Sequence, residues 1–250
     1  MLVTASTSTH RQPSFQPLYL QVRALLVELL EAGEWKPGEA IASELELAAR
    51  FHVAAGTVRK AIDALAADNL LVRRQGKGTF VATHTHEHPS QVRFLRIRRD
   101  DGVAEYPVSR MLDVRRGKAS ADTARLLSLR SGEAILMLRR VLAFEGVPGV
   151  LDDIVLPASL FRGLTKARYD AYRGPLYGFF ETEFGVRMLN ARERVKAVAA
   201  DAVAARALGV AVGQPLLAVE RVSYTYGERP VELRRGLCVT AHCHYFNALG

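Results

Sequence analysis

The fold of the N-terminal part can be predicted from residues 43–82, SELELAARFHVAAGTVRKAIDALAADNLLVRRQGKGTFVA. Ser43 and Glu46 have the spacing of a capping box, in which each residue satisfies a backbone N–H of the other at a helix start. The pattern predicts a short helix over residues 44–50 and a second one over residues 55–68. The inward positions of the second helix are Val58, Ile62 and Leu65. Two helices joined by a short turn predict a helix-turn-helix.

The same stretch ends in a predicted hairpin. Leu70–Arg74 and Thr79–Ala82 have the pattern of short strands around the turn Gln75-Gly76-Lys77-Gly78. Glycine permits a positive φ in such a turn and lets the backbone approach a phosphate closely. One more helix precedes the stretch, because apolar residues recur at helical spacing from residue 18 to residue 29. This order of elements predicts a winged helix, whose helix-turn-helix inserts its second helix into the major groove of DNA.

Residues 17–82 resemble the DNA-binding domain of the GntR family of bacterial transcription regulators. The motifs that carry the resemblance are PLYLQV, KPG, SELELA, TVRKA and RRQGKGTFV. The resemblance implies contacts with double-stranded operator DNA from the second helix of the helix-turn-helix and from the wing. We expect the DNA-binding residues to be Ser43, Thr57, Arg59, Lys60, Arg73, Arg74, Lys77 and Gly78. The local charge favours this, since residues 50–78 carry six Lys or Arg and two Asp.

Three positions depart from the family pattern. Leu45 stands where the family usually has an arginine, and Ala54-Ala55 stand where it has a Ser-Arg pair. A bidentate contact from arginine to guanine contributes about 1–3 kcal/mol of discrimination between bases. The missing serine is also the expected N-cap of the second helix. We therefore expect either an operator sequence that diverges from those of the family or weaker specificity, with DNA binding retained.

The remainder of the chain predicts an α+β domain built on an antiparallel sheet, because short helices are inserted between hairpin strands. The expected helices are Ser120–Leu129, Pro175–Phe184 and Asp201–Leu208. The expected strands are Ala134–Phe144, Val150–Leu156, Arg187–Val198, Leu216–Tyr226 and Val231–Tyr245. This domain is expected to span residues 93–250. Residues 1–16 are expected to form a flexible tail, and residues 83–92 a linker.

Residues 93–250 are similar to the UTRA ligand-sensing domain of the HutC-like branch of the GntR family, which has a chorismate-lyase-like fold. The similar pieces are LLSLRSGEAILMLRRV, IVLPASLF, PLYGFFETEFGV, AARALGVAVGQPLLAVERV and GERPVEL. The resemblance implies a homodimer that binds a small-molecule effector in a cleft. The effector-binding positions that it implies are Arg140, Asp152, Tyr177, Glu232 and Cys238.

Two of the positions that hold phosphate in this branch are different here. Leu142 replaces a frequent second arginine, and Pro175 replaces a hydroxyl residue. A buried anion needs charge-assisted donors. A carboxylate, an amino-acid derivative or another small polar metabolite is therefore favoured over a sugar phosphate.

The charge of the chain suggests an anionic partner without locating its site. The chain carries 34 Lys and Arg against 26 Asp and Glu, a net charge of +8. Residues 1–82 contribute only +1, from 9 basic and 8 acidic residues, and the remainder +7, from 25 and 18. No run of residues is apolar and long enough to span a bilayer. With only two cysteines, Cys238 and Cys243, we expect a cytoplasmic protein without a disulfide framework, a membrane partner or a cofactor.

Two alternatives stay open for the C-terminal domain. One is a lyase-like enzyme, although the chain has no Gly-x-Ser-x-Gly, Walker, His-Glu-x-x-His or dinucleotide-binding motif. The other is a metal-responsive regulator, because Cys238, His242 and His244 would share one face of the expected last strand. The favoured hypothesis is a ligand-responsive, sequence-specific transcription regulator. We expect a repressor that a small polar or anionic metabolite releases from its operator.

Overall fold

The computed structural model describes residues 16–84, 94, 96–103 and 107–247. Two compact units make up the chain, residues 1–82 and residues 83–250. The expected tail lies outside the described residues except for residue 16, and the expected linker does so except for residues 83 and 84. None of the helices in the described part of the chain is long and apolar enough to cross a bilayer.

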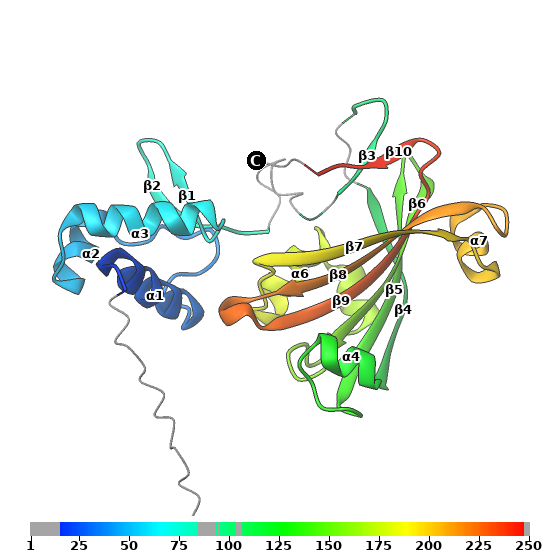
Figure 1. The fold of residues 1–250 in the computed structure, drawn as a ribbon, viewed down its shortest axis with the longest axis horizontal. Helices are drawn as coiled ribbons and strands as arrows, with labels where there is room; N and C mark the ends of the chain where they lie inside the picture. The colour runs from blue at the N-terminus through cyan, green and yellow to red at the C-terminus, as the bar shows by residue number, and fades with distance from the viewer. Residues whose placement is uncertain (1–15, 85–93, 95, 104–106, 248–250) are drawn as a thin grey trace, which may run out of the picture. The chain divides into compact units, whose positions relative to one another are not determined.

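The first unit is a winged helix, as predicted (Figure 1). Its elements are α1 (Leu18–Glu31), α2 (Glu44–Phe51), α3 (Ala55–Ala67), β1 (Leu71–Arg74) and β2 (Gly78–Val81). The two strands pair antiparallel to form the wing. His52 ends α2 in the left-handed conformation, with a φ of 55°, so only a short turn separates α2 from α3.

A small apolar core holds the three helices of this unit together. The fully or almost fully buried side chains are Val22, Leu26, Leu47, Val58, Ile62 and Leu65. Each such side chain contributes about 1.5–3 kcal/mol when it leaves water. These residues follow the helical period, so each helix turns one face inward and leaves its charged face exposed.

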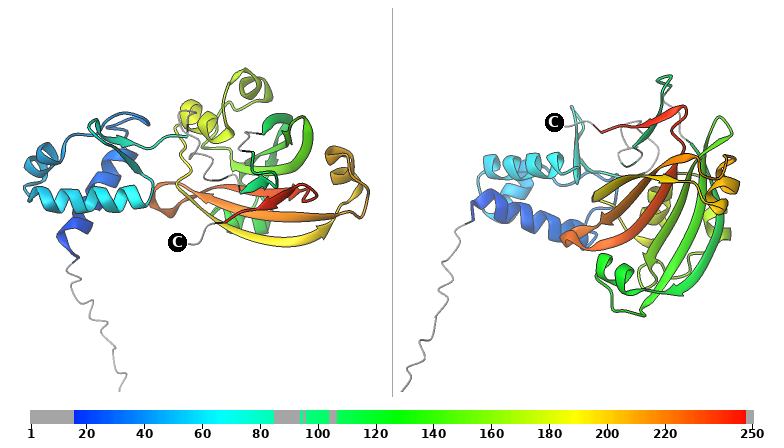
Figure 2. Two further views of the ribbon diagram at one scale, coloured as in Figure 1. Left: turned by 90° about the horizontal axis from the view of Figure 1, so that it is seen from above. Right: turned by 45° about the vertical axis from the view of Figure 1, so that its right-hand side comes forward.

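The second unit is built on one antiparallel sheet of six strands in the order β4-β5-β6-β9-β8-β7 (Figures 1 and 2). The strands are β4 (Val108–Lys118), β5 (Ala134–Phe144), β6 (Val147–Pro157), β7 (Asn190–Ala199), β8 (Pro215–Tyr224) and β9 (Pro230–Cys238). The helical elements are α4 (Ala121–Leu126), α5 (Lys166–Ala171), α6 (Leu176–Phe184), α7 (Ala202–Leu208) and the short 3-10 turn η2 (Tyr226–Glu228). The predicted α+β class is confirmed.

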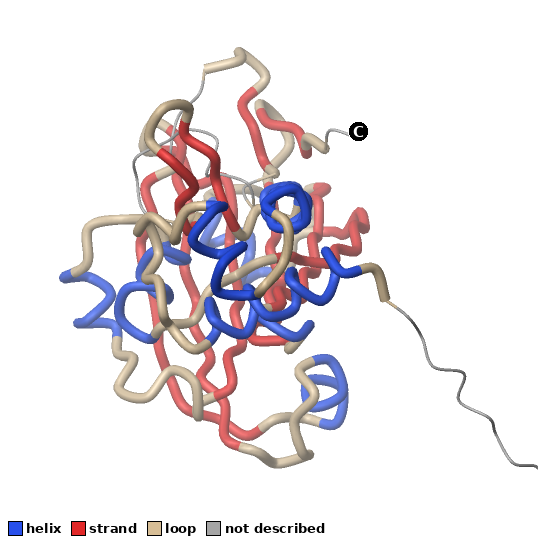
Figure 3. Tube along the Cα trace, turned by 90° about the vertical axis from the view of Figure 1, so that its left-hand side faces the viewer, coloured by secondary structure: helices blue, strands red, loops and turns tan. Residues whose placement is uncertain are grey.

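Two different structures cover one face of this sheet. At one end, α5 and α6 pack on the sheet residues Leu136, Leu138, Ile154 and Leu156. Loops connect these two helices to β6 and β7. Figure 3 distinguishes the helices, strands and loops of the chain by colour. At the other end lies a ribbon of β3 (Ile97–Arg99) and β10 (Cys243–Tyr245), which pair antiparallel. The ribbon packs on Leu142, Val150, Val219 and Cys238. The opposite face of the sheet carries α4 and α7, since alternate strand residues point to opposite sides.

Several predicted boundaries are wrong. The strand predicted over Val231–Tyr245 ends at Cys238. Cys238 pairs with Val150 of β6 and Leu217 of β8, and the described residues after it have no register partner in either strand. The chain then leaves the sheet and forms β10 with β3. The helix predicted up to Leu129 ends at Leu126, and Ser128 beyond it has a φ of 52°, which a helix does not allow.

Candidate nucleic-acid interface and ligand pocket

The starts of α2 and α3 are built differently. Ser43 Oγ accepts the Glu46 backbone N–H at 3.3 Å, and Glu46 Oε2 accepts the Ser43 backbone N–H at 2.8 Å. The predicted capping box is therefore present, and the Ser43 hydroxyl is engaged in it. Ala54, the N-cap of α3, makes no side-chain hydrogen bond. The helix that a helix-turn-helix presents to DNA thus lacks a cap contribution of about 0.5–2 kcal/mol.

Arg59 on α3 and Arg73 in the wing are held by carboxylates of their own unit. Arg59 Nε donates to Glu44 Oε2 at 2.8 Å, and its side chain is 64% exposed. Arg73, from the wing, lies 3.0 Å from the other oxygen of Glu44 and 2.8 Å from Asp63. Partial burial would raise the pKa of Glu44, but the hydrogen bonds from Arg73 and Arg59, together with their charges, lower it. Lys60 lies over the ring of Tyr19, with Nζ 4.3 Å from the centroid.

The wing presents its remaining positive charge at and beside the turn. Arg74 stacks over Phe80, with Cζ 4.6 Å from the ring centroid, and Lys77 is exposed at the tip. Gly76 and Gly78 have φ values of 70° and 108°. A Cβ on Gly78 would meet no atom within 4 Å, so the backbone conformation, and not packing, requires glycine there.

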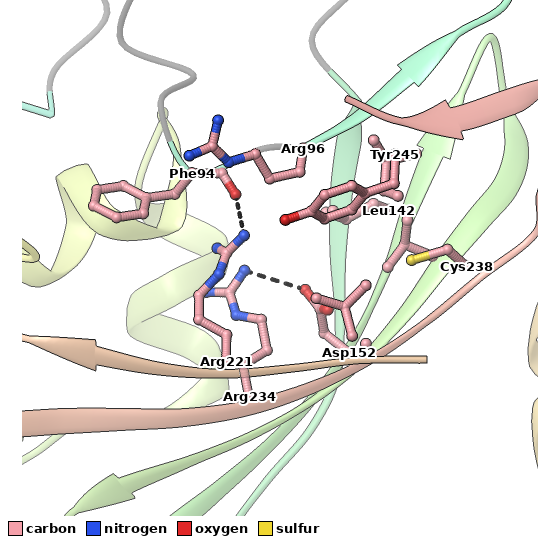
Figure 4. A pocket seen from close by; sticks show the side chains of 12 residues that line it. Phe94, Arg96, Leu142, Asp152, Arg221, Arg234, Cys238 and Tyr245 are labelled. Carbon is pink, nitrogen blue, oxygen red and sulfur yellow. Dashed lines mark hydrogen bonds and ion pairs between the residues drawn. The ribbon is translucent and has the colours of Figure 1, made fainter. Parts of the chain in front are cut away.

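The second unit contains a cavity between the sheet and the ribbon of β3 and β10 (Figure 4). It measures about 400 Å³, including space open to solvent. Its polar lining is Arg96, Asp152, Arg221, Arg234, Cys238 and Tyr245. Its apolar lining is Phe94, Ile97, Leu142, Val150 and Val219. An apolar cavity with a few convergent polar groups is typical of a small-molecule site.

Asp152 lies at the floor of this cavity and pairs with two arginines from neighbouring strands. Arg140, its cross-strand partner on β5, contacts its carboxylate at 2.8 Å, and Arg234 on β9 does so at 3.4 Å. Burial would raise the pKa of Asp152, but the charges of Arg234 and Arg140 outweigh it and lower that pKa. Asp152 is therefore ionised at neutral pH. Gly236 makes room for the carboxylate, since a Cβ there would lie 2.9 Å from Oδ1.

A second buried carboxylate, Glu232, connects this floor to α6. Its Oε2 accepts hydrogen bonds from the hydroxyls of Tyr177, at 2.5 Å, and Ser223, at 2.7 Å. Its Oε1 lies 2.5 Å from Arg234. Burial raises and Arg234 lowers the pKa of Glu232, and with the two hydroxyl donors the net shift is downward. Each polar atom of this group has a partner, as a buried network requires.

Arg221 occupies the wall of the cavity. It is the cross-strand partner of Arg234 on one side and of Glu193 on the other. Its Nε donates to Glu193 at 2.6 Å, and its Nη2 donates to the backbone carbonyl of Phe94 (Figure 4). Tyr245 also donates to Glu193, and burial together with this hydrogen bond raises the pKa of Tyr245 to about 12. The phenol is therefore neutral at physiological pH.

The five expected effector residues fall into two groups. Asp152 and Cys238 line the cavity, whereas Arg140, Tyr177 and Glu232 lie behind it in the buried network. The cations that line it, Arg221, Arg234 and Arg96, were not among the expected residues. The period of two along β9 was an available signal for one of them. It places Glu232, Arg234, Gly236 and Cys238 on one face of the strand.

The alternative of a metal site at the end of the chain is wrong in its geometry. Cys238 lies in β9, whereas His244 lies in β10 and contacts Asp100 at 2.7 Å. These residues therefore do not share a strand face. Among the described residues, no group of three or more His, Cys, Asp or Glu side chains could hold a metal ion.

Two family models match the chain. Residues 18–81 match the bacterial regulatory proteins of the gntR family, and residues 105–243 match the UTRA domain. The two matches correspond to the winged helix and to the sheet unit.

Curated relatives align over most of the chain. The chain is 32% identical over 224 residues to the probable transcriptional regulator PhnF of Escherichia coli K12, covering 88% of this chain and 90% of the relative. It is 26% identical over 228 residues to the probable fructoselysine utilization operon transcriptional repressor of the same organism, covering 90% and 91%.

Solved structures give the same assignment. The ligand-binding domain of a GntR-family regulator from Bordetella bronchiseptica is 50% identical, with a TM-score of 0.60. The alignment covers 63% of this chain and 98% of that domain. PhnF from Mycobacterium smegmatis shares the fold, with a TM-score of 0.53. It is 24% identical, and the alignment covers 92% of this chain and 99% of that chain. The prediction of a regulator related to the HutC-like branch is confirmed, and the chain belongs to the GntR family of bacterial transcription regulators with a UTRA domain.

Proposed function

We propose that this chain is a repressor that binds operator DNA through its winged helix and is released by a small anionic metabolite. The observation that carries the proposal is the combination of two units in one chain. One has a helix-turn-helix with exposed arginines, and the other has a cavity with three arginines in its lining. We propose further that the chain acts as a homodimer, because a dimer would read two half-sites of an operator. We also propose that it acts in the cytoplasm.

The proposed DNA-binding residues are those at the start of α2, on α3 and in the wing. They are Ser43, Thr57, Arg59, Lys60, Arg73, Arg74, Lys77 and Gly78. Glu44 and Asp63 hold Arg59 and Arg73 at the outer surface in the unbound protein. Phosphate or base edges would replace these carboxylates as partners, since charge-assisted contacts to arginine dominate such interfaces.

The proposed effector-binding residues combine expectation with the geometry of the cavity. Asp152, Cys238, Arg221 and Arg234 would contact the ligand, and Arg140, Tyr177 and Glu232 would hold them in position. Effector and operator are coupled reciprocally in any such regulator, typically by about 1–3 kcal/mol. An effector that weakens DNA binding is therefore bound more weakly by the DNA complex.

Binding to DNA fragments from the region of its own gene tests the proposal. We expect specific binding that Arg59→Ala reduces by at least about tenfold, the value of one charge-assisted contact. Arg23→Ala is the matched control, because Arg23 pairs with Asp68 beyond the last turn of α3 and should change affinity less than twofold. Absence of specific binding, or equal loss in both variants, would contradict the proposal.

A further inference from the structure

The ionic groups around the cavity leave one positive charge without a counter-charge. Three carboxylates, Asp152, Glu193 and Glu232, pair with three arginines of the same sheet face, Arg140, Arg221 and Arg234. Arg96 is the fourth arginine, half-buried at the rim of the cavity. It forms no ion pair with any residue that the structure describes, and its charge acts on Tyr245 across the cavity. The cavity therefore has room for one negative charge.

A backbone carbonyl now occupies the place where an anion would be held. Arg221 is buried, and its Nη2 points to the carbonyl of Phe94 at the edge of the cavity (Figure 4). Arg96 and Phe94 lie next to each other at this edge. A carboxylate is a stronger acceptor than a neutral carbonyl for the same guanidinium. A ligand carboxylate could accept from Arg221 and Arg96 together.

The remaining wall of the cavity is apolar. Leu142, Val150 and Val219 are buried in it, and Ile97 closes it from the ribbon. Cys238 adds a sulfur that stays a neutral thiol, because burial raises its pKa. A small ligand that consisted of little more than its anionic group at Arg221 would leave the apolar side chains of the wall in contact with water. The wall therefore favours a ligand with an apolar body.

Resting on the proposed function, we propose that the effector is a small monocarboxylate with an apolar body, and that its carboxylate replaces the Phe94 carbonyl on Arg221. A phosphate monoester carries up to two negative charges at neutral pH. Its second charge would lie without a counter-charge beside the ionised Asp152, and an unpaired charge away from water is strongly disfavoured. The single positive charge without a counter-charge among the described residues therefore favours a monocarboxylate over a phosphate monoester.

If a ligand replaced the Phe94 carbonyl on Arg221, Phe94 would move, and its contacts with residues at the start of the second unit would change. The Phe94 ring packs edge-on against Tyr177, with centroids 5.3 Å apart, and lies 6.0 Å from the ring of His84. His84 donates its backbone N–H to Glu181 at 3.2 Å, and its ring bonds to the Met188 carbonyl at 2.9 Å. The first unit ends at residue 82. Movement of Phe94 would therefore change the packing of His84, which lies two residues after the end of the first unit in the sequence.

Three probes with the same apolar body test the ligand class on the full chain. Calorimetric titration compares hexanoate, monohexyl phosphate and hexan-1-ol. We expect hexanoate to bind at least about tenfold more tightly than either of the others, which is the effect of one charge-assisted contact or one unpaired charge. Equal or tighter binding of monohexyl phosphate overturns the monoanion, and absence of hexanoate binding overturns the proposal.

Two variants locate the carboxylate. Arg96→Gln should weaken hexanoate binding about tenfold without changing thermal stability, since Arg96 has no described ion-pair partner to lose. Arg98→Gln is the matched control. Arg98 is on the same ribbon but exposed and stacked on Phe246, with Cζ 3.9 Å from the ring centroid. Equal effects of the two substitutions overturn the assignment.

A fluorescence experiment tests replacement of the carbonyl. Trp35 is the single tryptophan of the chain. The double variant Trp35→Phe, Phe94→Trp therefore reports only from position 94. We expect hexanoate to shift the emission maximum and hexan-1-ol to leave it unchanged. Hexanoate binding without a shift overturns the replacement. Operator binding by the unliganded chain is measured alongside, so a chain that binds DNA but no carboxylate contradicts this inference and leaves the proposed function intact.

Discussion

The Tyr177 hydroxyl donates a 2.5 Å hydrogen bond to Oε2 of Glu232, and this bond joins α6 to the centre of the sheet. Both side chains are buried. Glu232 also contacts Arg234, whose guanidinium lines the cavity. The helix that packs against Phe94 is thereby connected to the ligand pocket through one continuous set of charge-assisted hydrogen bonds.

Removal of this hydroxyl should destabilise the second unit. Tyr177→Phe leaves Glu232 with only Ser223 and Arg234 as donors, at a cost of about 1–3 kcal/mol for an incompletely satisfied buried group. Thermal unfolding of the full chain measures the effect. Tyr224→Phe is the control, because the Tyr224 hydroxyl makes no hydrogen bond with the described residues. A loss of equal size in both variants would show that the hydroxyl bond contributes nothing specific.

The contribution of Asp152 should depend on pH in a defined direction. Its folded pKa is lowered, so its stabilisation is complete above the unfolded pKa of about 4 and is lost as the pH falls through the folded value. Asp152→Asn should therefore cost about 3 kcal/mol at pH 7, and this cost should begin to decrease once the pH falls below the unfolded pKa of about 4.

Scanning calorimetry at pH 7 and pH 3 checks this prediction. The adjacent Asp153→Asn serves as control, because Asp153 forms a partly exposed pair with Arg139 and such pairs contribute about 0–1 kcal/mol. A difference between wild type and Asp152→Asn that stays constant from pH 7 to pH 3 would contradict the assignment of an ionised, arginine-bound carboxylate.

The uncapped start of α3 can be improved. Ala54→Ser places a hydroxyl at an N-cap whose backbone is already extended, with φ −67° and ψ 143°. We expect the first unit to gain about 0.5–2 kcal/mol in its free energy of unfolding, measured by urea denaturation followed through Trp35. Ala67→Ser, at the other end of the same helix, should give no gain. Equal changes in both variants would exclude capping as the cause.

Glu44 should weaken DNA binding in the native protein. Glu44→Gln removes a negative charge from the proposed interface and releases Arg59 and Arg73. We expect affinity for DNA to rise by roughly threefold to tenfold at low salt, measured by fluorescence anisotropy. Glu34→Gln, which releases only Arg50, is the control. Weaker binding by Glu44→Gln would show instead that this carboxylate holds the arginines in their DNA-bound positions.

Local patterns in the sequence were sufficient for the winged helix. The Ser43–Glu46 capping box, the helical spacing of Val58, Ile62 and Leu65, and the glycines of the wing each act within a few residues. The hairpin strands of the second unit were predictable for the same reason. The edge strand β4 was not predicted, because most of its residues are exposed or half-buried and no alternating apolar pattern marks it.

Local sequence patterns were therefore enough to predict the two units, their order and the fold class of each. The residues that line the pocket, in contrast, are brought together by the packing of the folded sheet. Arg221 and Arg234 come from different strands and Phe94 comes from a distant part of the chain, so their contact depends on strand order and register. Leu142 and Pro175 indicated too few donors for a sugar phosphate, and the register of β8 against β9 supplies two further arginines, Arg221 and Arg234. Strand register depends on the packing of the whole sheet and is not encoded in any single segment.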